Sequence, residues 1–85
     1  MAEKENTPSI WRPKTVSAKT GLPLSTIRAR RKAGLLPSAV PIGARSVGYV
    51  SSEIEAVIRA QIAGRSDDQI RDLVARLAAQ RAKAA

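Results

Sequence analysis

One proline and two glycines, residues with unusual backbone preferences, divide the first half of the chain into two short helical stretches. Pro13 suits the first turn of a helix, where its missing N–H costs no hydrogen bond. Gly21 and Gly34 suit the left-handed conformation that closes a helix. The spacing predicts helices over 13–20 and 24–33, joined by a turn that contains glycine. This is the helix-turn-helix arrangement.

The second of these stretches is strongly cationic. It holds four cations in the five residues 28–32, and Ile27 is the residue expected to point toward a core. At 3.6 residues per turn, the opposite stripe of the helix holds Ser25, Arg28, Ala29 and Lys32. A short helix of this kind, flanked by a second helix and a basic turn, is suited to lie against nucleic acid.

The net charge of +8 is concentrated in one part of the chain. Residues 6–52 hold eight cations and no carboxylate, whereas residues 53–85 hold six cations and five carboxylates. A block of this composition is typical of a protein that binds a polyanion. The alternative is a basic surface that is merely solvated.

The composition also argues against several kinds of site. The 85 residues include no Cys and no His, so thiolate and imidazole metal ligands and the usual general base are missing. We therefore expect no enzyme, no cofactor, no metal and no small-molecule ligand. The N-terminal residues do not form a signal peptide and no segment is long enough to span a membrane, so a cytoplasmic location is expected.

The segment after the two helices predicts a small β-hairpin. Two short apolar runs, which contain Val40, Ile42, Val47 and Val50, surround a glycine-bounded tip at Arg45. We call this hairpin the wing. Its short arms are marginal alone, so it must pack on the helices.

Two further helices are predicted in the last third of the chain. The first begins at Ser51 or Ser52 and ends at Gly64, and its first turn holds carboxylates that favour a helix N-terminus. Its apolar face is expected to comprise Ile54, Val57, Ile58 and Ile62. The carboxylates of its first turn are Glu53 and Glu55.

The final helix is expected over about 67–82, after a capping box formed by Ser66 and Gln69. Its apolar positions are Ile70, Leu73, Val74, Leu77 and Ala78. Its other face mixes Asp72 with Arg71, Arg76 and Arg81. This helix either closes the core or presents a stripe to a partner, and a homodimer through it stays open.

The segment 20–37 resembles the helix-turn-helix of MerR-type regulators. Thr20-Gly21 precedes Thr26-Ile27-Arg28, and Gly34-Leu35-Leu36 follows. The segment from Pro41 to Ala56, with Gly43, Arg45 and the sequence GYVSSEIEA, resembles the AlpA-type phage regulators still more closely. Both belong to one winged helix-turn-helix group that also includes phage excisionases.

The resemblance covers residues 10–75 and implies a mainly α fold with a small β-hairpin wing and about four helices. The expected domains are an arm without structure over 1–9, a DNA-binding domain over 10–64 and a C-terminal helix over 65–85. The resemblance also implies a bacterial, nucleoid-associated protein. The absence of Cys means that metal sensing does not carry over from MerR proteins.

Specific roles follow for the basic segment. Arg28 is the candidate that reads guanine, and it matches the DNA-contacting arginine of the family. Ala29 can meet a thymine methyl group, and Ser25 and Thr26 suit a phosphate near a helix N-terminus. The remaining candidates for backbone contacts are Lys14, Arg30, Lys32 and Tyr49. Arg45, at the tip of the wing, is expected to enter the minor groove or to bind the flanking backbone. For Tyr49, packing under the wing is an equal alternative.

The sequence thus predicts a transcriptional regulator of phage or prophage genes, an activator, that binds double-stranded DNA. Two alternatives remain. One is an antitermination or RNA-polymerase-associated factor, for which the partner residues would be Arg71, Asp72 and Arg76. The other is an excisionase-like factor that bends DNA.

Overall fold

The two predicted N-terminal helices are present in the computed structural model, which describes residues 9–84, with side chains to residue 81. They are α2 (Pro13–Thr20) and α3 (Leu24–Lys32). Gly21, at φ 75°, closes α2 and its N–H donates to the Ser17 carbonyl at 2.8 Å. Apart from Ser9, the N-terminal arm expected over 1–9 lies outside the described residues.

The wing is part of a three-stranded antiparallel sheet. Its strands are β1 (Ile10–Trp11), β2 (Val40–Pro41) and β3 (Val47–Val50), in the order β1-β3-β2. Trp11 lies opposite Tyr49, and Val40 lies opposite Gly48. The sequence predicted the hairpin but not β1, because a two-residue strand has no periodicity to recognise.

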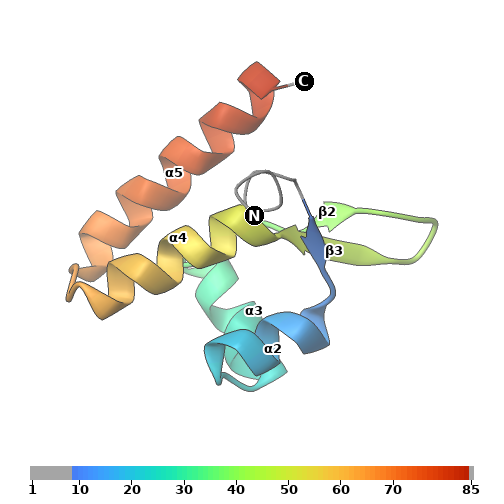
Figure 1. Cartoon of the computed structure of the whole chain (residues 1–85), viewed down its shortest axis with the longest axis horizontal. Coiled ribbons are helices and arrows are strands. Elements are labelled where there is room, and N and C mark those ends of the chain that lie inside the picture. Colours follow the sequence, from blue (N-terminus) through green and yellow to red (C-terminus); the bar gives the residue numbers. More distant parts are fainter. Residues whose placement is uncertain (1–8, 85) are drawn as a thin grey trace, which may run out of the picture.

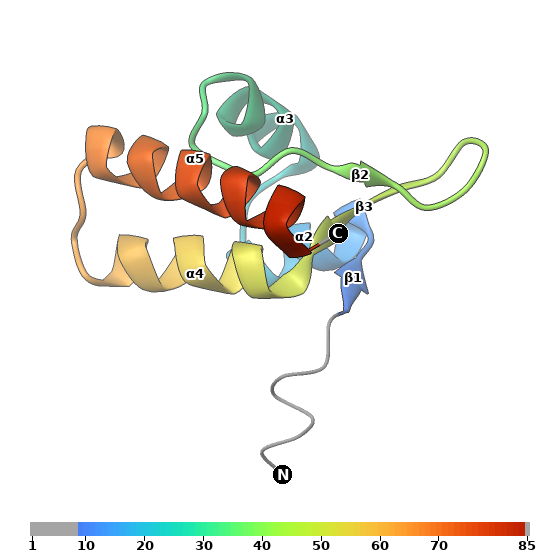
Figure 2. The same ribbon diagram turned by 90° about the horizontal axis from the view of Figure 1, so that it is seen from above.

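The second half of the chain forms an antiparallel pair of helices, α4 (Ser51–Ile62) and α5 (Asp67–Ala84) (Figure 1). The predicted capping box opens α5. The Ser66 N–H donates to Gln69 Oε1 at 2.9 Å, and the Gln69 N–H donates to Ser66 Oγ at 3.2 Å. Figure 2 shows α3 and α4 at opposite edges of the helical body, with the wing extending beyond it.

The core is small and aliphatic apart from one tyrosine. Each helix contributes to it, and its buried members are Val16, Ile27, Leu36, Tyr49, Ile54, Val57 and Ile70. The predicted apolar face of α4 is wrong at its last position, because Ile62 is 81 % exposed. Ile62 is the last residue of α4, and its side chain lies open to solvent. Ala78 of α5 is also exposed.

The first turn of α4 holds a buried carboxylate. Glu53 is 6 % exposed, and both of its oxygens accept hydrogen bonds from Arg81 of α5. The same guanidinium donates to the Ser38 carbonyl at 2.7 Å. Arg81 therefore joins α5 to α4 and to the connection that follows α3. Its expected place on a solvent-facing stripe is wrong.

Candidate nucleic-acid interface

One face of α3 is fixed in the core and the opposite face is open to solvent. Ile27 is 1 % exposed and belongs to the core cluster. The residues of the predicted stripe, Ser25, Arg28, Ala29 and Lys32, are all exposed. In the described part of the chain, the side chains of Arg28 and Lys32 have no salt bridge. Their cationic groups are therefore free for a polyanion.

A shallow hollow of about 480 Å³ lies beside α3. Its lining includes four of the predicted contact residues, namely Ser25, Thr26, Ala29 and Arg30. The N-cap residue of α3 is Pro23, and no side chain caps the helix. The first N–H groups of α3 therefore lack a side-chain acceptor at this end, as a phosphate-binding helix N-terminus requires. The structure thus brings these side chains together with a free helix start.

Helix α2 presents its own cation. Lys14, in the first turn, is exposed. Lys19, at the other end of the helix, instead lies over the ring of Trp11, with 5.4 Å between Nζ and the ring centroid. Trp11 is half-buried against the core. This tryptophan is thus a packing residue that holds β1 on α2.

The tip of the wing carries Arg45. The hairpin is closed by a hydrogen bond of 2.9 Å from the Ile42 N–H to the Ser46 carbonyl. Arg45 lies within this closed loop and is exposed. Because the loop projects beyond the helices (Figure 2), Arg45 can contact a part of a bound polyanion that lies outside the reach of the helices.

Tyr49 occupies the core, so a direct contact of its hydroxyl with phosphate is wrong for this structure. The residue is 2 % exposed, and its hydroxyl accepts a hydrogen bond of 3.5 Å from Nη1 of Arg31. Arg31 is itself half-buried. The contact lies between α3 and β3. Packing under the wing, the alternative for Tyr49, is what the structure shows.

The C-terminus of α3 is held by a residue that sequence reasoning assigned to a partner. Arg71 of α5 donates from Nε to the Ala33 carbonyl at 3.0 Å, and its Nη1 lies 3.1 Å from Asp68. Arg71 is thus a positioning residue for α3. Among the residues the structure describes, Asp72 and Arg76 of the predicted partner set remain without a salt bridge.

Within residues 9–84 no three His, Cys, Asp or Glu residues cluster as a metal site would require. In that same part of the chain, no helix combines the length and the apolar character needed to cross a bilayer. What the structure does present is a basic, solvent-facing helix, set against a second short helix and braced by a basic wing.

These features define a winged helix-turn-helix protein. Residues 9–62 match the family model described as prophage CP4-57 regulatory protein (AlpA). The chain belongs to this family, as the resemblance of its sequence implied. No curated protein and no solved structure matches the chain. The matched region ends with the last residue of α4, so α5 lies outside it.

Proposed function

We propose that this protein is a sequence-specific, double-stranded DNA-binding regulator of transcription of phage or prophage genes. One observation carries the proposal: α3 is anchored by Ile27 while Arg28 and the rest of its basic stripe face solvent. The membership in a family described as prophage regulatory supports it. The proposal gives the chain no enzymatic role.

In this proposal α3 lies in the major groove. Arg28 donates two hydrogen bonds to O6 and N7 of a guanine, the commonest contact that specifies a base. Ala29, one residue on, lets the backbone approach and offers its methyl group to a thymine. Ser25 and Thr26, at the free helix start, bind a phosphate through their hydroxyls and the adjacent N–H groups.

The remaining cations position the protein on the duplex without reading sequence. Lys32 and Arg30 of α3 and Lys14 of α2 contact phosphates on either side of the groove. Arg45 enters the flanking minor groove or binds the backbone beside it. Because these contacts release counterions, about 6–8 neutralised phosphates give a slope of log affinity against log salt near −5 to −7.

The base-reading role is tested with the Arg28→Ala variant. A duplex library is selected on the wild-type chain, and binding is then measured for the preferred site and for each single base change. Arg28→Ala should remove about 1–3 kcal/mol of discrimination at one base pair. Arg59→Ala, which removes an exposed arginine from α4, is the matched control and should keep the preference. Uniform weakening across all sequences would overturn the assignment.

The direction of regulation is proposed to be activation. An RNA-polymerase-associated or antitermination role is the second candidate, and the exposed Asp72 and Arg76 of α5 favour it. Expression of a reporter gene with the selected site upstream distinguishes these regulatory roles from DNA binding without an effect on transcription. A variant with Asp72→Ala and Arg76→Ala that binds DNA normally but fails to activate would indicate a protein partner. This variant is preferable to deleting α5, because Arg71 and Arg81 hold α5 on the domain.

An excisionase-like role in bending DNA makes a different prediction. Such a factor would occupy adjacent sites and bring the ends of a doubly labelled duplex closer together in a fluorescence-transfer measurement. A regulator at a single promoter site would do neither.

A further inference from the structure

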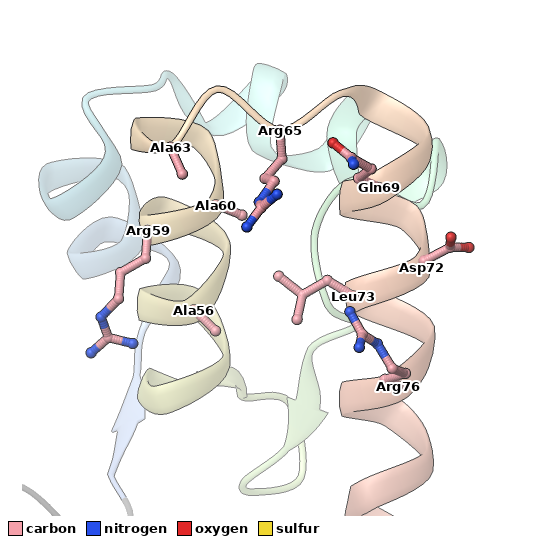
Figure 3. A pocket seen from close by; sticks show the side chains of 9 residues that line it. All are labelled: Ala56, Arg59, Ala60, Ala63, Arg65, Gln69, Asp72, Leu73 and Arg76. Atoms are coloured by element: carbon pink, nitrogen blue, oxygen red, sulfur yellow. The ribbon is translucent and has the colours of Figure 1, made fainter.

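A groove of about 490 Å³ lies between α4 and α5. Its α4 side is made of small apolar residues, and Leu73 faces them from α5 (Figure 3). These small residues are Ala56, Ala60 and Ala63. Because alanines leave space above the helix backbone, a large apolar side chain from outside can enter here and lose contact with water.

The groove is cationic as well as apolar. Figure 3 shows Arg65, from the turn between the helices, and Arg76, from α5, pointing into the space between them. Arg59 lies on the outer side of α4, and Asp72, the one carboxylate of the lining, points away from the groove. The interior of the groove is therefore positive, without a carboxylate to balance it.

Arg65 and Arg76 differ from Arg71 and Arg81 in their partners within the molecule. Arg71 and Arg81 both bind carboxylates and backbone carbonyls of the same molecule. No salt bridge within residues 9–81 involves Arg65 or Arg76. Two guanidinium groups that face one groove without anions repel each other, and a carboxylate placed between them would be attracted by both.

The groove opens on the side of the molecule away from the candidate DNA-binding face. α3 lies behind α4 and α5 in the view into the groove (Figure 3), and Figure 2 places α3 and α4 at opposite edges of the body. A duplex against α3 would therefore leave the groove open, and both surfaces can be occupied together.

We propose that this groove binds an acidic amphipathic helix of a partner protein. Large apolar side chains of that helix would fill the space over Ala56 and Ala60, and its flanking Glu or Asp residues would pair with Arg65 and Arg76. This is the helix-in-groove mode of recognition. A nucleic acid would use the cations but would leave the apolar floor uncovered. The proposal does not depend on whether α3 binds DNA.

The test uses a fluorescent helical peptide of about 18 residues, with a stripe of leucines flanked by glutamates. Its two counterparts have every glutamate replaced by lysine, or the same composition in scrambled order. Binding to the full chain is measured by fluorescence anisotropy, with and without a saturating duplex. The acidic peptide should bind in both states, whereas the basic peptide should not bind and the scrambled one should bind at least about tenfold more weakly.

Variants locate the binding site. Arg76→Glu and Arg65→Glu should each weaken peptide binding about fivefold or more, since each replaces an attraction by a repulsion. Ala60→Leu should weaken it by filling the floor. Arg12→Glu makes the same charge change outside the groove and should alter the affinity by less than about twofold. Circular dichroism confirms that each variant is folded, and the surface variant Arg76→Glu tests the proposal even if Ala60→Leu does not fold.

Two results would overturn the proposal. One is an equal loss of peptide binding in Arg12→Glu and Arg76→Glu, which would mean that only net charge matters. The other is that a non-specific duplex competes with the peptide for the wild-type chain and that this competition disappears in Arg76→Glu. Such a result would make the groove a nucleic-acid surface. Failure of the chain to bind any duplex would contradict the proposed regulator and would leave the peptide result unchanged.

Discussion

Glu53 and Arg81 form the most buried ion pair among the described residues. The Glu53 side chain is 7 % exposed and that of Arg81 28 %. The hydrogen bond with Glu53 is the main cause that raises the pKa of Arg81 above its ordinary value, and burial opposes it. Because the pKa of Arg81 is raised in the folded state, its pairing stabilises the fold fully at every pH below the ordinary pKa of arginine. This stabilisation is lost only when the pH rises above that value. Arg81 therefore contributes no pH dependence near neutrality.

Breaking this pair should destabilise the protein. Arg81→Leu leaves the Glu53 carboxylate buried without its donor and frees the Ser38 carbonyl. We expect the free energy of unfolding to fall by about 2–4 kcal/mol in urea denaturation. The Glu53→Gln, Arg81→Leu double variant removes the charge and should recover part of the loss. Asp68→Asn breaks the exposed pair with Arg71, in which Asp68 is 93 % exposed, and should have no measurable effect.

The absence of a side chain at Gly48 leaves room for the Ile10 side chain of the neighbouring strand β1. A Cβ at this position would lie 2.1 Å from Cγ2 of Ile10. We expect Gly48→Ala to cost about 1 kcal/mol, because the exposed Ile10 side chain must move to another rotamer. Ile10→Ala removes the clashing methyl group, so the double variant should be more stable than the sum of the two single changes. Gly43→Ala, whose Cβ would lie 3.7 Å from Ser46 Cβ, is the control and should be nearly neutral.

The helices were predictable because residues near each helix end in the sequence determine where it begins or stops. Pro13 and Gly21 bound α2, and the Ser66–Gln69 capping box opens α5. Strand β1 was not predictable, because only its pairing with β3 makes it a strand. The burial of the Glu53 side chain was equally unpredictable from the sequence. It depends on Arg81, which is distant in sequence, while the local pattern indicated only a helix N-terminus.

The apolar face of α4 shows the limit of periodicity and can be tested. Ile54 is fully buried, whereas Ile62, two turns later and also assigned to the core-facing side, is 81 % exposed. Ile54→Ala should lower the free energy of unfolding by about 2–4 kcal/mol, because it leaves a cavity in the core. Ile62→Ala should change it by less than about 0.5 kcal/mol. Equal losses in urea denaturation would mean that the end of α4 is covered in solution.

The candidate site was predictable where one helix determines it. Burial of Ile27 fixes the opposite stripe of α3, so the exposure of Arg28 and Lys32 follows from helical geometry alone. The burial of Tyr49 and the contacts of Arg71 within the molecule were not predictable, because both environments come from other elements. Tyr49 meets Arg31 from α3, and Arg71 meets the Ala33 carbonyl. A sequence shows which face of a helix is polar, but the neighbours that occupy that face come from the tertiary fold.

Over the whole molecule, charge is divided between two faces. Residues 6–52, a range that includes α2, α3 and the wing, hold eight cations and no carboxylate. The α4–α5 pair holds both signs, and its groove opens away from α3. The first surface should therefore dominate the salt dependence of DNA binding. The second should contribute only through weak, screened attraction over longer distances.

This division predicts which arginines change the number of counterions released. Arg45→Ala removes a cation at the tip of the wing, so the slope of log affinity against log salt should become shallower by about one. Arg59→Ala removes the same charge from the α4 side and should leave the slope unchanged within error. Both slopes are measured by anisotropy on one duplex over a series of salt concentrations. If the slope responds equally to the two changes, net charge and not the wing sets the phosphate contacts. If the slope is unchanged in Arg45→Ala, the wing is not part of the interface.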